Sequence, residues 1–206
     1  MSLMTILIKG GYLMIVLALC SVVAVVIIVE RFLFYRKMKL NKIVFLSDLR
    51  KSIGSGVRTA KEVCRRYKGI IPDIIIAGLD HFEGGAEAIR KNMEVQTVKK
   101  IHDAERYLGA LATIVAISPL IGFLGTVIGM IKAFMKIEFL GGNVNASALA
   151  GGIWEALITT AAGLSVAIIA YIFYNYFVGR VETLSRDIAE VTEEAMNIYH
   201  TTRRSE

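Results

Sequence analysis

The sequence contains few of the residues that form disulfide frameworks or metal centres. Its 206 residues include two cysteines, three histidines, two prolines and one tryptophan. Cys20 and Cys64 are too few for a disulfide framework, and their spacing does not match that of zinc ligands. The histidines His81, His102 and His200 have no ligand partners at metal-binding spacing. These shortages argue against a disulfide-stabilised secreted domain and against a metal centre built from cysteine and histidine.

Catalytic and nucleotide-binding motifs are also missing. The sequence has no constellation of serine, cysteine and histidine typical of nucleophilic catalysis. Gly122, Gly125 and Gly129 lie in a hydrophobic segment and lack the lysine that a phosphate-binding loop requires. Basic residues are interspersed with acidic ones, and no nucleic-acid-binding motif accompanies them. We therefore expect no enzymatic activity, no cofactor, no metal site and no nucleic-acid partner.

Apolar residues, in contrast, make up 55% of the chain, and the mean hydropathy is +0.57. Three stretches carry no charge and reach the length of a membrane span, namely 10–29, 107–131 and 156–179. At about 1.5 Å per residue, each of the last two exceeds a hydrocarbon core of roughly 30 Å. A signal peptide is the alternative for the first stretch, but only Lys9 precedes it and no A-x-A cleavage site follows. We expect an uncleaved membrane anchor.

The distribution of charge predicts the topology. Residues 31–106 carry 17 Lys/Arg and 9 Asp/Glu, whereas the other connections are short and weakly charged. The positive-inside rule places 31–106 in the cytoplasm, the N-terminus and 133–152 outside, and the C-terminus inside. A thiol reagent should then reach Cys64 only from the cytoplasmic side. We therefore expect a multi-pass protein of the inner membrane, in contact with lipid.

We expect an all-α membrane protein with three transmembrane helices, of which the second and third extend into the cytoplasm. No glycine or proline interrupts 86–106 or 180–199, so each of these stretches should continue its span as one helix. In the C-terminal stretch, apolar residues recur every three or four positions. The predicted segments are 1–30 (short outer N-terminus and first span), 31–106 (cytoplasmic helical segment), 107–132 (second span), 133–152 (periplasmic connection), 153–179 (third span) and 180–206 (cytoplasmic helical tail).

The second and third spans contain small and polar residues that a simple anchor would not need. Glycines allow helices to approach closely, whereas hydroxyl and carboxyl groups in a membrane core require a polar partner or water. Pro119 frees one backbone carbonyl and introduces a kink, which can itself shape a pore. The candidate helix-packing residues are Pro119, Gly122, Gly125, Gly129 and Gly163.

Glu155 is the one acidic residue that lies clearly within an apolar stretch. It either reaches the lipid headgroups at the outer end of the third span or faces a polar lumen, where it helps to attract cations. Thr126 and Thr160 lie deep in the spans, where a threonine either bonds to its own helix or holds a file of water. Thr159 lies nearer than Thr160 to the helix face of Glu155, since five residues correspond to roughly 140° around a helix. Spacing by itself leaves these alternatives open.

Two motifs resemble those of a known family. Ser118 to Ile131, SPLIGFLGTVIGMI, resembles the second-span signature of the ExbB/TolQ/MotA proton-channel proteins. Residues 153–163, IWEALITTAAG, resemble their third-span signature, and Tyr174 to Phe177 matches a common exit motif. The single span before the cytoplasmic segment favours ExbB/TolQ over flagellar MotA, which has two spans there.

The resemblance implies a homo-pentamer of three-span subunits with a central pore. Within the pore would lie a dimer of a single-span, ExbD- or TolR-like partner that contributes a titrating aspartate. Proton flow would drive a TonB- or TolA-like periplasm-spanning protein, with sodium as an alternative ion. By motif, Thr126 and Thr160 would line the path and Glu155 its outer part, with Thr159 beside it.

Three other functions compete with this interpretation. The chain is either a passive scaffold for a partner's membrane helices, a stator of a related gliding or flagellar motor, or a transporter for a small solute. The absence of inverted span repeats argues against the transporter.

Overall fold

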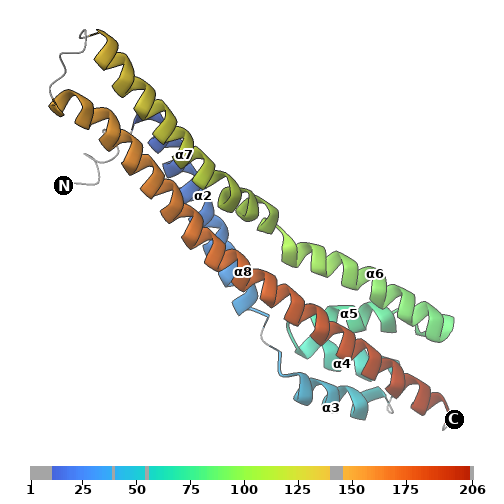
Figure 1. The fold of residues 1–206 in the computed structure, drawn as a ribbon. Helices are drawn as coiled ribbons and strands as arrows, with labels where there is room; N and C mark the ends of the chain where they lie inside the picture. Colours follow the sequence, from blue (N-terminus) through green and yellow to red (C-terminus); the bar gives the residue numbers. More distant parts are fainter. Residues whose placement is uncertain (1–10, 39, 54–55, 140–145, 205–206) are drawn as a thin grey trace. The chain divides into compact units, whose positions relative to one another are not determined.

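The structure is a computed structural model that describes residues 11–38, 40–53, 56–139 and 146–204. Within these ranges all regular structure is helical (Figure 1). The elements are α2 (Gly11–Arg36), α3 (Lys42–Ile53), α4 (Val57–Arg66), α5 (Ile70–Leu79), the 3-10 turn η1 (Phe82–Gly84), α6 (Gly85–Glu105), α7 (Leu108–Phe139) and α8 (Ala146–Arg204).

The chain forms two compact units. Unit 1 comprises Met1–Glu30 with Tyr107–Tyr176, and unit 2 comprises Arg31–Arg106 with Phe177–Glu206. In the described residues, helices long and apolar enough to cross a membrane occur in Gly11–Arg36, Phe82–Phe139 and Ala150–Thr201. The prediction of a helical protein with three apolar spans is therefore confirmed, while the predicted segment boundaries stay predictions.

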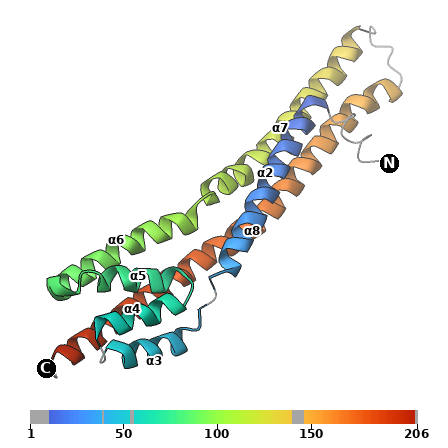
Figure 2. The same ribbon diagram turned by 180° about the vertical axis from the view of Figure 1, so that it is seen from behind.

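In unit 1 the helices α2, α7 and α8 lie side by side, as both views show (Figures 1 and 2). Part of the predicted connection 133–152 is helical, because α7 continues to Phe139 and α8 begins at Ala146. Residues 140–145 of that connection, and 1–10 of the predicted outer N-terminus, lie outside the described residues. Many exposed side chains of α7 are large and apolar, as expected of a surface that faces lipid or another membrane helix.

The helix expected to run without interruption into the second span is broken, contrary to the prediction. α6 ends at Glu105 and α7 begins at Leu108, with Tyr107 in the left-handed region at φ 67°. In unit 2, Arg31 donates hydrogen bonds to the carbonyls of Asp103 (2.9 Å) and Ala104 (3.1 Å). Tyr35 donates a hydrogen bond to the same Ala104 carbonyl at 2.7 Å. Arg31 and Tyr35 thus donate to carbonyls that would otherwise accept hydrogen bonds from the backbone N–H groups of the next helical turn. With these carbonyls satisfied, α6 can end here.

The third span and the C-terminal stretch form one helix, as the sequence predicts. α8 covers 59 residues from Ala146 to Arg204. Its C-terminal part packs on α3 to α6 in unit 2, where Ile188 and Val191 are fully buried. The predicted stripe of apolar residues is therefore a packing surface. Its members are Val181, Leu184, Ile188, Val191 and Ala195.

Ion pairs join α3 to the same part of α8. Lys42 contacts both Asp187 at 2.8 Å and Glu190 at 2.7 Å. These two hydrogen bonds to carboxylates raise the pKa of the Lys42 ammonium group. The pairs are partly exposed, so each contributes modestly to stability and mainly fixes the position of α3.

Cys64 lies in α4 with no exposed surface, contrary to the expectation that it is accessible. Burial raises the pKa of its thiol to about 12, so almost no reactive thiolate is present at neutral pH. Cys64 therefore cannot report the topology of the folded protein.

An exposed position on the same helix provides the topology test instead. The side chain of Arg58 is 95% exposed. In a Cys20→Ala background, we expect Arg58→Cys to react with a membrane-impermeant maleimide only after spheroplasts are permeabilised. The parent with Cys64 alone should stay unlabelled until it is denatured. Labelling of Arg58→Cys in intact spheroplasts would place this segment outside and overturn the topology.

Candidate ion-path site between α7 and α8

Small residues line the contact between α7 and α8 in unit 1. A β-carbon added to Gly163 would lie 2.5 Å from the carbonyl oxygen of Ser118. One added to Gly129 would lie 2.7 Å from the carbonyl oxygen of Gly152. The two backbones therefore approach more closely than any larger side chain would permit. The buried face of α7 that makes this contact consists of Ser118, Gly122, Gly125, Gly129 and Ala133.

Four of the predicted packing glycines, Gly122, Gly125, Gly129 and Gly163, thus lie in one interface. Gly125 faces Thr159 so closely that any β-carbon would overlap the threonine hydroxyl. Pro119 lies next to this face, inside α7, and is partly buried.

Thr160 forms a hydrogen bond between the helices. Its Oγ1 donates to the carbonyl oxygen of Gly122 on α7 at 2.9 Å. The alternative, in which a membrane threonine bonds to its own helix, therefore does not describe this residue. The bond depends on glycine at position 122, because a β-carbon added there would lie only 3.0 Å from the Cα of Thr160. The hydroxyl oxygen keeps its acceptor capacity.

Thr159 and Thr126 occupy different environments. Thr159 is 1% exposed, and its hydroxyl donates to the carbonyls of Glu155 and Ala156, both at 2.9 Å. It is a packed interface residue in the single chain. Thr126 is half-buried and donates to the carbonyl of Phe123 in its own helix at 2.6 Å. The structure thus brings Thr159 and Thr160 to one interface and leaves Thr126 apart from them.

Glu155 forms an ion pair that sequence reasoning missed. Its Oε1 lies 2.6 Å from Nζ of Lys132 on α7. The side chain of Glu155 is 19% exposed and that of Lys132 45%. Lys132 is not among the site residues that the sequence predicts. In the structure Gly129 packs on Ala156, the residue after Glu155, and Lys132 lies about one turn from Gly129 on α7. No pattern in the sequence indicates this register.

A third helix closes the other side of Glu155. Gly11, at the start of α2, lies so near the carboxylate that a β-carbon there would overlap Oε1. A narrow crevice beside the carboxylate has no room for a water molecule. Its walls come from all three helices of unit 1, through Tyr12, Leu13, Gly125, Ile128, Glu155 and Thr159. No three His, Cys, Asp or Glu side chains gather as metal ligands in the described parts of the chain.

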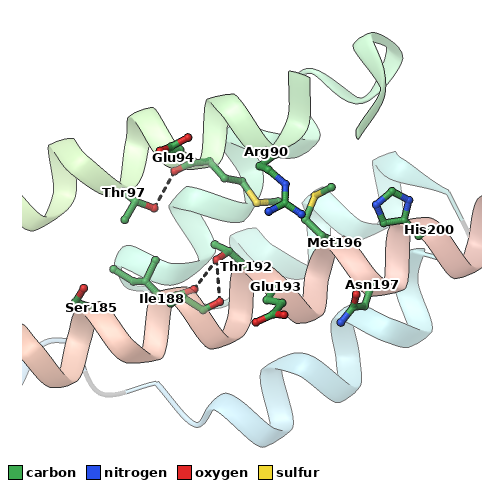
Figure 3. A pocket seen from close by; sticks show the side chains of 12 residues that line it. Arg90, Glu94, Thr97, Ser185, Ile188, Thr192, Glu193, Met196, Asn197 and His200 are labelled. Carbon is green, nitrogen blue, oxygen red and sulfur yellow. Dashed lines mark hydrogen bonds between the residues drawn. The ribbon is translucent and has the colours of Figure 1, made fainter. Parts of the chain in front are cut away.

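Unit 2 contains a larger cavity, of about 600 Å³, between α6 and α8 (Figure 3). Arg90, Met196 and His200 lie toward one end, and Thr97 and Ser185 toward the other. The lining mixes both signs of charge with apolar side chains. None of the predicted site residues lies here, and the mixed lining selects no ligand class.

The family that the motifs resemble also matches more than half of the chain. A model of the MotA/TolQ/ExbB proton channel family matches residues 66–190, which include α7 and the candidate site residues on α7 and α8. ExbB-like 1, a biopolymer transport protein of Synechocystis, is 32% identical over 194 residues. That match covers 93% of this chain and 76% of the Synechocystis protein.

Two further relatives match more locally. The biopolymer transport protein ExbB of Salmonella typhimurium is 33% identical over 114 residues, which are 53% of this chain and 46% of that protein. The Tol-Pal system protein TolQ of Haemophilus influenzae is 38% identical over 108 residues, or 52% and 47% of the two chains. The aligned part thus spans about half of these two relatives. Since the family model covers more than half of the chain and the Synechocystis match covers nearly all of it, the chain belongs to the MotA/TolQ/ExbB proton channel family.

Proposed function

We propose that the chain is the proton-channel subunit of an inner-membrane motor that is driven by the proton-motive force. The motor would energise a TonB- or TolA-like partner that spans the periplasm. The observation that carries the proposal is the pair of polar groups, Thr160 and Glu155, at the glycine-lined contact of two membrane helices. Such groups are costly in an apolar bundle and usually mark an ion pathway. The relatives named ExbB and TolQ support the same class of function.

The proposed assembly is a homo-pentamer whose pore is lined by α7 and α8. A dimer of an ExbD- or TolR-like single-span protein would occupy the pore. In one chain, Thr126 lies apart from Thr160, which is consistent with a lining completed by a neighbouring copy. The N-terminus would be periplasmic and the C-terminus cytoplasmic, and unit 2 would lie in the cytoplasm.

The proposed path uses the predicted residues in distinct ways. Thr160 and Thr126 would offer hydroxyl oxygens to protons or water, and Glu155 would lie at the outer end. Thr159 would hold the backbone of Glu155 in place through its hydrogen bond to that carbonyl. The proposed driving ion is the proton, and sodium is the alternative. No bound cofactor is needed for this role.

Co-expression and co-purification with an ExbD- or TolR-like single-span protein from the same genome tests the assembly. We expect a stable complex whose native mass contains several copies of the 22.7 kDa chain and fewer of the partner. In liposomes, the complex should dissipate an imposed pH gradient, whereas a passive scaffold would bind the partner without conducting. A complex that assembles and carries no protons in any energised state would contradict the proposed function.

A further inference from the structure

The ion pair between Lys132 and Glu155 is the part of the candidate site with the clearest chemistry. A carboxylate in apolar surroundings is costly unless a cation and hydrogen bonds compensate for the lost water. Lys132 supplies both, because its ammonium group is a charged hydrogen-bond donor 2.6 Å from Oε1. In the described part of the chain it is the one cationic side chain within ion-pair distance of Glu155. The pair as a whole is electrically neutral.

The surroundings of Glu155 leave little space for another cation. Gly11 of α2 covers one side of the carboxylate, and the crevice next to it has no room for water. Tyr12 is the other titratable side chain that lines this crevice, and the remaining lining is apolar apart from Thr159. The hydroxyl of Thr159 already donates to backbone carbonyls. A hydrated or oxygen-coordinated metal ion would therefore find few ligands besides the carboxylate that Lys132 holds.

On the basis of the proposed function, we infer that Lys132 controls the access of cations to the Glu155 carboxylate in the ion path. Its ammonium group occupies the Glu155 carboxylate, so that a proton or a metal cation reaches this carboxylate only when the ion pair separates. The carboxylate of Glu155 can then bind a cation only after the Lys132 side chain has moved away. In this it differs from a carboxylate at the mouth of a pore that is always free to bind cations. In the single chain the Lys132 side chain is 45% exposed, so it is not enclosed on all sides.

A hydrophobic carbodiimide can measure this occupancy directly. Dicyclohexylcarbodiimide reacts with a protonated carboxylic acid in apolar surroundings: the acid oxygen bonds to the central carbon and the proton moves to a nitrogen. The full chain in native membranes is treated, and the modification of Glu155 is followed by mass spectrometry of its peptide. We expect the wild-type residue to react about tenfold more slowly than Glu155 in Lys132→Met, because in the wild type the ammonium group holds the carboxyl oxygen that would attack the reagent.

Two matched variants separate charge from shape. Lys132→Arg keeps the cation and should react as slowly as the wild type. Lys132→Gln keeps a hydrogen-bond donor without the charge and should react as fast as Lys132→Met. Only variants with a wild-type thermal unfolding midpoint are compared. Sodium chloride, relative to choline chloride at equal ionic strength, should slow the reaction in the uncharged variants and leave the wild type unchanged.

Three results would overturn the inference. These are equal rates in the wild type and the uncharged variants, slow reaction in Lys132→Gln, or protection of wild-type Glu155 by sodium. If every variant misfolds, the wild-type measurement is sufficient. Rapid modification of wild-type Glu155, or its protection by sodium, would contradict the inference without any variant. The labelling requires neither the partner nor ion flux. A complex that fails to conduct while this labelling pattern holds would therefore contradict the proposed function and leave the occupancy of Glu155 by Lys132 intact.

Discussion

Gly125→Leu is expected to prevent assembly of the protein and to leave no folded pore whose conduction could be measured. Gly125 is buried on α7, and even a β-carbon there would overlap the hydroxyl of Thr159. Thr159 cannot rotate away at low cost, because its hydroxyl bonds to two carbonyls of α8 and its side chain is buried. A leucine would force the two helices apart. We expect a loss of about 3 kcal/mol or more, at the upper end of typical overpacking.

A second glycine on the same helix provides the matched control. An added β-carbon at Gly109 meets nothing within 4 Å, so Gly109→Leu should assemble normally. Native mass spectrometry and the thermal midpoint of both variants, at equal expression, give the comparison. An intact oligomer of wild-type stability in Gly125→Leu would show that α7 and α8 do not pack through this face.

Thr160→Val is expected to abolish energy transduction while assembly stays largely intact. Valine has nearly the shape of threonine but can neither donate nor accept a hydrogen bond. The variant loses the bond to the Gly122 carbonyl, and a hydrogen bond of this kind contributes only about 1 kcal/mol in a membrane bundle. Thr160→Ser keeps the hydroxyl and should retain part of the activity. The measurement is energised uptake or envelope integrity with the partner present.

Thr113 on α7 offers a control for the general effect of removing a membrane hydroxyl. Its hydroxyl is exposed and donates to the carbonyl of Gly109 in its own helix at 2.9 Å. Thr113→Val should therefore transduce energy normally. Full activity in Thr160→Val would instead make Thr160 a packing residue, and the proton path would have to run elsewhere.

The structural features that could be predicted from the sequence are those with a pattern along a single helix. Apolar length predicted three spans, and the spacing of glycines predicted a close helix contact, which is the one between α7 and α8. These features depend on residues within one helix, so a local pattern is enough to reveal them. The apolar stripe that includes Ile188 and Val191 was predictable for the same reason, because a helix repeats its faces every three to four residues.

Contacts between residues distant in sequence could not be predicted. No glycine or proline marks the break after α6. The hydrogen-bond donors to the last carbonyls of α6 come from Arg31 and Tyr35, about 70 residues earlier in the chain. The burial of Cys64 depends likewise on helices that pack around α4. For Glu155 the sequence showed the acid but not the partner, since the reach of Lys132 depends on the register of two helices.

The glycine-lined contact of α7 and α8 has a consequence for how the protein can move. Gly122, Gly125, Gly129 and Gly163 have no side-chain rotamers, so the contact cannot adapt by repacking as a contact between leucines can. Sliding one helix along the other would press a larger residue against a backbone that leaves no space. The two helices therefore behave as one rigid body. Any relative movement of helices in unit 1 then has to occur at the outer surfaces of this pair, and not between its two members.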